Sequence, residues 1–380
     1  MKQLSFVLCV FFLAGFLFPL LSCDFSFGGD TGEEESATWD TAPRLQDIYR
    51  NHFLLGNVVS PNDPGTVRFN LLKRHYSSAT AENAMKPISI APSVKPAADI
   101  WAYRWTDADK VVQAVNDAGL EMHGHTLVWH SQTPQWLSSG DKETVLNNLT
   151  RYVTEVTTHF KAKLISWDVG NEAMKDGLLP SDVAGGNWEN CLRSDDNPWN
   201  KVIGPEYIEK AFLAARAADP DVKLFYNDYN LNNANKARAV YNMVIDINQR
   251  YPNVGGRPLI DGIGMQSHHH LYTDPQTIEA SIQLFASLGV KIAISEMDIE
   301  AAGNLPGATV TWGEDAARRQ AAQYAAMFRI FKTYASSISR VTFWGLDDGT
   351  SWKAGTHPTL LNSDFGLKPA FYAVANPERY

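Results

Sequence analysis

An eightfold alternation of apolar, β-type segments with helical segments limits the fold of this chain more than any other feature. The runs expected to form strands cover residues 53–59, 77–82, 121–128, 164–169, 222–227, 260–266, 290–296 and 340–345. Segments with helical periodicity lie between or after them, at residues 67–74, 107–119, 142–160, 205–218, 233–251, 274–288, 314–334 and 368–375. Strands that are joined through helices run parallel, and eight such repeats predict an α/β fold, the (β/α)8 TIM barrel.

An open, doubly wound parallel sheet is the alternative to a barrel. It is disfavoured because no Gly-x-Gly-x-x-Gly motif follows the first strand. Hydrophobic residues make up 44% of the chain and charged residues 20%, a balance that suits one large buried core. No linker or change in composition divides residues 41–380, so we expect a single domain there, with its active site where the barrel strands end.

The first 40 residues predict an export signal and a tether. Lys2 precedes an apolar run over residues 4–21, and the sequence Leu-Leu-Ser then leads to Cys23. A positive start, a short apolar core and small residues before a cut are typical of a secretory signal. Leu-Leu-Ser-Cys also resembles a bacterial lipobox, which implies lipidation of Cys23; an uncleaved anchor and an ordinary cleavage nearby are the alternatives. We expect a lipoprotein signal peptide at 1–22, an acidic flexible tether at 23–40, and an exported protein anchored by lipid to the bacterial cell envelope, at the outer membrane or cell surface.

The negative charge of the chain is concentrated in this tether. The formal net charge is −9, but residues 24–40 contain six acids and no base. Residues 41–380 hold 32 bases and 36 acids, a nearly balanced −4. A body with this charge is not expected to present a broad phosphate-binding face, so we expect no nucleic-acid partner.

The three cysteines predict neither a disulfide nor a cysteine-based metal site in the body. Cys9 leaves with the signal peptide and Cys23 is the lipidation site, so Cys191 has no partner.

Two carboxylates are placed where buried strands are expected to end. Glu172 closes the sequence Trp-Asp-Val-Gly-Asn-Glu at the end of the fourth strand, and Glu296 closes the seventh. These strands lie across the barrel mouth from one another, so both carboxylates can point into one cleft. Either glutamate alone would be explained as a solvated or salt-bridged residue. Together they predict hydrolysis of a glycosidic bond, which needs one acid and one carboxylate that attacks or activates water.

Other strand ends carry groups that suit a sugar. Hydroxyls need closely placed donors and acceptors, and the faces of pyranose rings stack on aromatic side chains. Amide, carboxylate, ammonium, imidazole, phenol and indole groups follow the other strands at Glu82, Asn83, Lys86, His125, Trp129, Gln132, Asn227, Tyr229, Gln266, His268, Trp344 and Trp352. Among the tryptophans, we expect Trp129, Trp344 and Trp352 to line the cleft, and Trp101, Trp105 and Trp167 to serve packing.

Metal binding is a competing interpretation of the histidines. His123 and His125 on the third strand, with the His268-His269-His270 triplet, could supply metal ligands. Barrel metallohydrolases usually place a His-x-His pair on the first strand instead. Strand alternation also sends adjacent residues of the triplet to opposite faces. We therefore expect no metal and no cofactor.

Six motifs extend the pattern along the chain. They are Glu-Asn-x-Met-Lys (82–86), His-Thr-Leu-Val-Trp-His-x-Gln (125–132), Trp-Asp-Val-x-Asn-Glu (167–172), Tyr-Asn-Asp-Tyr (226–229), Gly-Ile-Gly-Met-Gln-Ser-His (262–268) and Ser-Glu-x-Asp-Ile (295–299). In identity and order they resemble glycoside hydrolase family 10, the retaining endo-β-1,4-xylanases, over about residues 41–376.

The resemblance implies specific roles. Glu172 would be the acid/base and Glu296 the nucleophile, Asn171 would bind the 2-hydroxyl of the reacting sugar, and Asp298 would support His268 against Glu296. Further residues implied to bind sugar are Glu82, Asn83, Lys86, His125, Trp129 and Gln132 on the glycone side, Asn227, Tyr229, Gln266 and His268 in the floor, and Trp344 and Trp352 over the sugar nearest the cut. The implied partners are xylan and xylo-oligosaccharides, bound by a monomer that meets the membrane only through its lipid anchor.

Retention implies two carboxyl groups about 5–5.5 Å apart. We expect the charge of Glu296 to raise the pKa of Glu172, so that Glu172 stays protonated near neutral pH. A catalytically inactive glycan-binding lipoprotein and a cellulase-like or exo-acting enzyme are the competing functions.

The chain departs from the family pattern at three places. Gly170 stands where a bulky apolar residue is usual, and a glycine within a strand loosens the backbone. Met297 replaces the commoner Leu, a change that conserves volume. Residues 181–200 form a longer segment than usual, which either shapes the leaving-group side of the cleft or is an ordered surface loop.

Overall fold

The structure is a computed structural model that describes residues 37–97, 100–302 and 310–380. The expected signal peptide at 1–22, the lipidation site Cys23 and the tether up to residue 36 lie outside these residues. Residues Ala37–Tyr380 form one compact unit. No helix among the described residues is long and apolar enough to cross a membrane.

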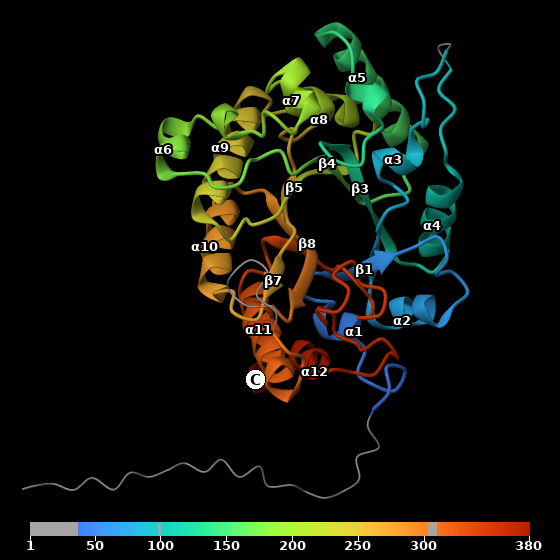
Figure 1. The fold of residues 1–380 in the computed structure, drawn as a ribbon, viewed down its shortest axis with the longest axis vertical. Helices are drawn as coiled ribbons and strands as arrows, with labels where there is room; N and C mark the ends of the chain where they lie inside the picture. The colour runs from blue at the N-terminus through green and yellow to red at the C-terminus, as the bar shows by residue number, and fades with distance from the viewer. Residues whose placement is uncertain (1–36, 98–99, 303–309) are drawn as a thin grey trace, which may run out of the picture. The chain divides into compact units, whose positions relative to one another are not determined.

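Eight parallel strands close into a barrel, as the sequence predicts (Figure 1). The barrel strands are β1 (Leu54–Val59), β2 (Ser78–Ala81), β3 (Glu121–Trp129), β4 (Ser166–Asn171), β5 (Lys223–Asp228), β6 (Gly262–Met265), β8 (Lys291–Glu300) and β9 (Ile338–Phe343). Each strand pairs with its neighbour, β6 pairs with β8, and β9 returns to pair with β1. The sheet is therefore closed, which rules out the open doubly wound alternative.

One further strand was not expected. The histidine triplet forms β7 (His268–His270), which pairs with the outer half of β8 beyond the barrel. Its register places His268 opposite Asp298, so the pairing itself brings these two residues together.

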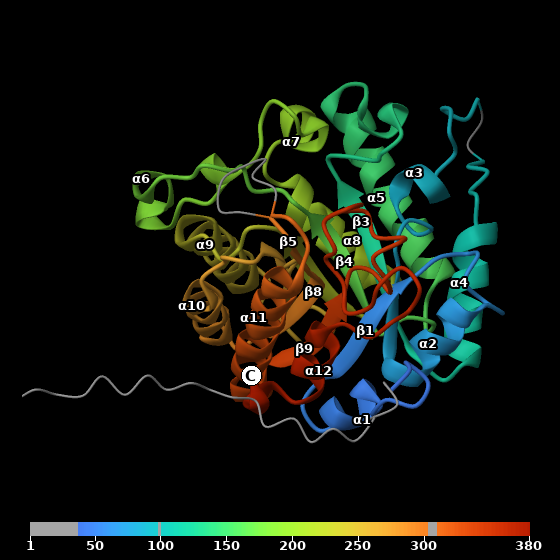
Figure 2. The same ribbon diagram turned by 60° about the horizontal axis from the view of Figure 1, so that its bottom comes forward.

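The helices surround the barrel (Figures 1 and 2). Those expected from periodicity are present as α2 (Val67–His75), α4 (Thr106–Asp117), α5 (Lys142–His159), α8 (Tyr207–Ala218), α9 (Ala234–Arg250), α10 (Pro275–Ala286), α11 (Glu314–Thr333) and α12 (Pro369–Ala375). Short elements that periodicity did not predict are α1 (Leu45–Tyr49), α3 (Pro87–Ile90), α6 (Pro180–Val183), α7 (Pro198–Ile203), η1 (Gln135–Ser138), η2 (Ala184–Gly186), η3 (Glu189–Cys191) and η4 (Pro377–Arg379).

Local sequence explains where the long helices begin and which face they bury. The Asp141 side chain accepts a hydrogen bond from the Thr144 amide and caps α5. Val145, Leu149 and Val156 then fall on one side of that helix and are buried against the barrel. Asp274 caps α10 in the same way, accepting from the Gln276 amide.

Packing outside the barrel involves the tryptophans expected there. Trp167 is 1% exposed and lies against Gly124, where any added Cβ would come within 2.3 Å of its ring. Trp101 and Trp105 are half-buried against the core, and Trp105 stacks on His159. Gly170 has room by comparison, since its Cβ would meet Tyr226 at 3.5 Å and Phe212 at 3.8 Å, both ordinary contacts.

The barrel interior holds a buried charged cluster that the sequence did not reveal. Asp168 Oδ2 lies 2.9 Å from His123 Nε2 and 3.0 Å from His125 Nδ1, while Arg340 Nη2 lies 2.8 Å from His123 Nε2. Burial opposes ionisation of Asp168, but His123, His125 and Arg340 outweigh it and hold its pKa well below the usual range. His123 and His125 are thus part of an internal polar layer beneath the barrel mouth.

Candidate active site

A cavity of about 290 Å³ lies at the carboxyl ends of the strands. It is lined by Glu82, Asn83, Lys86, His125, Trp129, Gln132, Asn171, Glu172, Gln266, His268, Glu296, Trp344 and Trp352. All of these were candidates from the sequence, and they come from six of the eight barrel strands or the residues that follow them. Trp129, Trp344 and Trp352 are the three tryptophans expected at a cleft.

Glu172 immediately follows β4 and adopts a left-handed backbone conformation, with φ of 55°. That conformation costs a non-glycine residue about 1–2 kcal/mol, so its surroundings must hold it. Its carboxylate accepts hydrogen bonds from Trp129 Nε1 at 2.9 Å and from Gln266 Nε2 at 2.8 Å. The side chain is therefore fixed at the edge of the cavity.

The pKa of Glu172 is raised, as expected, but chiefly for another reason. Burial is the largest cause, and the negative charges of Asp228 and Glu296 add to it. The hydrogen bonds from Gln266 and Trp129 favour the ionised form and oppose the rise. Glu296 is thus one contributor to the raised pKa rather than its main source.

Glu296 lies within β8 and is 5% exposed. Its Oε1 accepts a hydrogen bond from Asn227 Nδ2 at 2.7 Å, and its Oε2 lies 3.3 Å from His268 Nε2. Burial by itself would raise the pKa of this carboxyl, but His125 and His268 outweigh burial and lower it. The two glutamates thus have pKa values displaced in opposite directions, the arrangement by which a carboxyl pair divides the acid and nucleophile roles.

Two amides link the carboxylates to each other. Gln266 Nε2, which donates to Glu172, also lies 3.3 Å from Asn171 Oδ1. Asn227 Nδ2, which donates to Glu296, lies 3.0 Å from that same Asn171 oxygen. Because the chain of contacts is short and buried, the positions of the two carboxylates are coupled.

His268 is held by the pairing of β7 with β8. Its Nδ1 lies 2.8 Å from Asp298 Oδ2, which also accepts a hydrogen bond from Trp352 Nε1 at 2.9 Å. Burial alone would lower the pKa of His268, but the Asp298 and Glu296 carboxylates raise it to about 9. An imidazolium at this position keeps the neighbouring Glu296 ionised.

A second polar group follows β2. Lys86 Nζ donates to Asn83 Oδ1 at 2.9 Å and lies 5.4 Å from the centre of the Trp129 ring. Burial lowers the pKa of Lys86 and raises that of Glu82. These side chains form one wall of the cavity.

Three sequence candidates are not among the residues that line the cavity. Asn227 and Asp298 act through Glu296 and His268, as described above. Tyr229 does not line the cavity, and its hydroxyl contacts Asp176 and Arg193.

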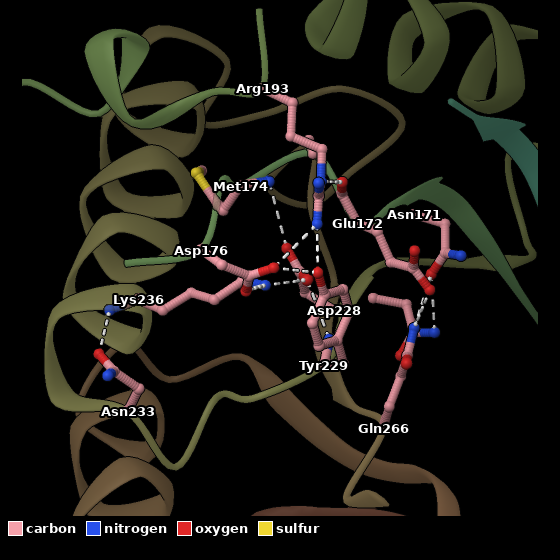
Figure 3. A network of polar contacts seen from close by, with 12 residues as sticks. Asn171, Glu172, Met174, Asp176, Arg193, Asp228, Tyr229, Asn233, Lys236 and Gln266 are labelled. Carbon is pink, nitrogen blue, oxygen red and sulfur yellow. Dashed lines mark hydrogen bonds and ion pairs between the residues drawn. The ribbon is translucent and has the colours of Figure 1, made fainter. Parts of the chain in front are cut away.

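The 181–200 segment is packed against the active site. Trp188, Cys191 and Trp199 are buried, and Trp199 Nε1 donates to the main-chain oxygen of Trp129 at 3.0 Å. Arg193 Nε donates to the main-chain oxygen of Glu172 at 3.1 Å (Figure 3). Sequence reasoning had not singled out Arg193, because its contacts with Glu172 and Tyr229 join separate parts of the chain.

The histidine triplet divides between faces, as alternation predicts. His268 lines the cavity, whereas His269 is buried and its pKa is lowered to about 3 by burial. Within residues 37–97, 100–302 and 310–380, no group of three or more His, Cys, Asp or Glu side chains is arranged to hold a metal ion.

A parallel barrel with two unlike carboxyls and three indoles at its carboxyl-terminal mouth defines the class of barrel proteins built to act on glycosides. Residues 44–377 match the family model described as glycosyl hydrolase family 10. This match covers most of the chain, and the protein belongs to that family.

Individual relatives agree with the family match. The chain is 37% identical over 359 residues to endo-1,4-beta-xylanase A of Thermotoga maritima, with 88% of this chain and 31% of that protein covered. It is 36% identical over 351 residues to a beta-1,4-xylanase of Dictyoglomus thermophilum, covering 90% of this chain and 93% of that one. A crystal structure of a family 10 xylanase with a bacterial Ig-like domain, from termite gut, is similar with a TM-score of 0.80 and 35% identity, covering 90% of this chain and 79% of the other. Because only 31% of the Thermotoga protein is covered, this chain spans about a third of that protein's length.

Gln266→Met should raise the pKa of Glu172 further. The substitution removes the donor to Glu172 Oε1 and with it a hydrogen bond that favours the ionised carboxylate. Titration of ¹³C-labelled glutamate carboxyls by NMR measures the change, with Glu172→Gln used to assign the signal. The exposed Gln113→Met on α4 is the matched control and should leave the titration unaltered. An unchanged or lower pKa in Gln266→Met would contradict the electrostatic account of this site.

Proposed function

We propose that this protein is a retaining endo-1,4-β-xylanase, which hydrolyses internal β-1,4-xylosidic bonds of xylan by double displacement. The observation that carries the proposal is that Glu172 and Glu296 line one cavity with pKa values displaced in opposite directions. Membership of family 10, and the xylanase names of the relatives that this chain resembles, support the same activity.

In the first step, protonated Glu172 donates its proton to the glycosidic oxygen while Glu296 attacks the anomeric carbon. The bond to the leaving sugar breaks, and a glycosyl ester of Glu296 forms. Asn227 and His268 hold the Glu296 oxygens from two sides, so the attacking carboxylate is already oriented before substrate binds.

In the second step, water replaces the leaving sugar and attacks the same anomeric carbon. Glu172, now ionised, takes a proton from this water, and the ester bond to Glu296 breaks. The exchange of roles follows from charge, because ester formation neutralises Glu296 and removes one of the two negative charges that raise the pKa of Glu172. Two inversions at one carbon give net retention.

The walls of the cavity suit a largely neutral polymer. Glu82, Asn83 and Lys86 offer paired donors and acceptors for sugar hydroxyls, and the indoles of Trp344 and Trp352 offer apolar faces. Trp352 is 55% exposed, so part of its ring remains available to a ligand. An additional hydroxymethyl group, as in glucose, must fit among Glu82, Asn83, Lys86 and Trp352, which makes these residues the determinants of xylose over glucose.

A time course of products from unbranched xylan tests the activity. The purified wild-type protein should release a mixture of oligosaccharides early, which is the signature of internal cleavage. Xylose or xylobiose alone would contradict endo action, and faster release from β-1,4-glucan would contradict the substrate. Absence of release from both polymers would instead favour a glycan-binding protein without catalysis.

Azide rescue tests the two carboxylate roles. Glu172→Ala should lose about 10²–10⁴-fold in turnover of xylan, the usual contribution of a general acid. With an activated aryl xylobioside, azide should restore its turnover and yield a β-glycosyl azide, because the small anion replaces the water that Glu172 activates. Glu296→Ala should gain nothing by this retaining route. A β-azide product from Glu296→Ala would reverse the roles assigned to the two glutamates. No rescue of either variant would remove the assignment altogether.

We further propose that the protein is exported as a monomer and held at the cell envelope by lipid on Cys23. The support is the sequence of residues 1–23, where a positive start and an apolar run lead to Leu-Leu-Ser-Cys. The acidic segment that follows would serve as a spacer between the lipid and the enzyme.

Cys23→Ala should move the enzyme from the membrane fraction to the soluble fraction of the producing bacterium. The thiol is the acceptor of the lipid, so its loss removes the anchor without touching the cavity. Xylanase activity and immunodetection in both fractions measure the shift, with Cys191→Ala as the matched cysteine control. Retention of Cys23→Ala in the membrane fraction would contradict lipid anchoring.

A further inference from the structure

The turn that carries Glu172 is bracketed by the 181–200 segment. Arg193 N donates to the main-chain oxygen of Ala173 at 2.9 Å, and Lys175 N donates to that of Cys191 at 2.9 Å. Met174 and Leu192 form an antiparallel bridge between these bonds. Residues 191–193 therefore run alongside residues 173–175 as a short added strand.

Strand β5 holds the opposite side of the same turn. Glu172 N donates to Asn227 O at 2.9 Å, Ala173 N donates to the Tyr226 hydroxyl at 3.0 Å, and Met174 N lies 3.3 Å from Asp228 Oδ2. The main-chain amides of the turn are thus fixed by the barrel, whereas the main-chain oxygen of Glu172 receives its hydrogen bond from Arg193.

Arg193 itself has several polar partners. Its guanidinium lies 2.8 Å from Asp196 and 3.3 Å from Asp176, and it contacts the Tyr229 hydroxyl. Lys236 continues the network by pairing with Asp176 at 3.1 Å and with the buried Asp228 at 3.0 Å (Figure 3). Cations and carboxylates alternate through this cluster, and only 12% of the Arg193 side chain is exposed.

We propose that Arg193 is a positioning residue for proton donation by Glu172 and acts through the main-chain oxygen of that glutamate. The inference rests on the proposed function. Glu172 occupies a left-handed conformation that surrounding contacts must impose, and Arg193 supplies the contact that the barrel does not. Without the guanidinium, the residue relaxes and its carboxyl is no longer directed at the glycosidic oxygen.

The side chains that orient the nucleophile lie outside this cluster. Glu296 lies on β8 and is oriented by Asn227 and His268, neither of which contacts Arg193 in the network of described residues. Loss of Arg193 should therefore impair proton donation while sparing attack. The 181–200 segment keeps its other attachments, including the hydrogen bonds of Trp199 to Trp129 and of Trp188 to Asp246.

The way in which the loss of activity depends on the leaving group distinguishes a positioning role of Arg193 from a merely structural one. An aryl xylobioside with a good leaving group, such as 2,4-dinitrophenolate, needs no acid to depart, whereas phenolate and the sugars of xylan do. In Arg193→Met, kcat/KM on xylan and on phenyl β-xylobioside should fall on the order of 10²-fold, as expected for a misplaced catalytic group. On the dinitrophenyl substrate kcat/KM should be retained, while kcat and KM fall together because the second step still needs Glu172 as base.

Two variants serve as comparisons. Arg193→Lys keeps the positive charge but has one ammonium in place of the guanidinium fork, so its loss on poor leaving groups should be smaller. Arg318→Met on α11 removes an exposed arginine that pairs with Asp315, and it should match wild type on every substrate. Circular dichroism and thermal unfolding establish that each variant is folded, and Arg193→Lys decides the question if Arg193→Met does not fold.

The possible results have distinct meanings. A loss that grows as the leaving group worsens supports the proposal. An equal loss on all substrates, or none, in a folded Arg193 variant overturns it while leaving the xylanase assignment intact. A wild-type enzyme that releases nothing from xylan overturns the proposed function itself, and the role of Arg193 with it.

Discussion

Closure of the parallel sheet is the constraint on which the site depends. Gly56 of β1 lies opposite Ser78 of β2 on one side and opposite Thr342 of β9 on the other, so the ladder has no free edge between the first and last barrel strands. All the strands then point their carboxyl ends at the same rim, and side chains as distant in sequence as Glu82, Glu172 and Glu296 line one cavity. The helices complete this arrangement by burying the outer face of the sheet.

Much of this fold could be predicted from the sequence because its signals are local. Apolar runs of strand length mark the barrel strands, and capping residues such as Asp141 and Asp274 mark helix starts. What escaped prediction depends on contacts made elsewhere. The short α7 in the 181–200 segment begins at Pro198 after capping by Asn197, yet its Trp199 is anchored to Trp129, far away in the chain. The short β7 forms only because β8 continues beyond the barrel and offers it a partner.

The same distinction between local signals and long-range contacts applies to the candidate site. Position at a strand end is a local property, and it selected most of the cavity-lining residues, including both glutamates, whereas Asn171 was added by the family resemblance. For the pKa of Glu172, the direction of the shift was predictable from the sequence but its main cause was not. The direction of the Glu172 pKa could be foreseen from a neighbouring carboxylate, but its main cause is burial, which depends on the whole cavity. Asp168, Arg340 and Arg193 carry no spacing signal, because each acts on partners from other strands or loops.

The contact between His268 and Glu296 has a consequence for the lifetime of the proposed covalent intermediate. An imidazolium 3.3 Å from a carboxylate oxygen stabilises that oxygen when it is negative. In the ester the charge of Glu296 is gone, while Asp298, which raises the pKa of His268 more than Glu296 does, remains in contact with the imidazole. The His268 imidazolium therefore favours departure of the Glu296 carboxylate from the ester, for the same reason that it favours ionisation of Glu296 in the free enzyme. One histidine thus disposes the enzyme to discharge its intermediate rather than to accumulate it.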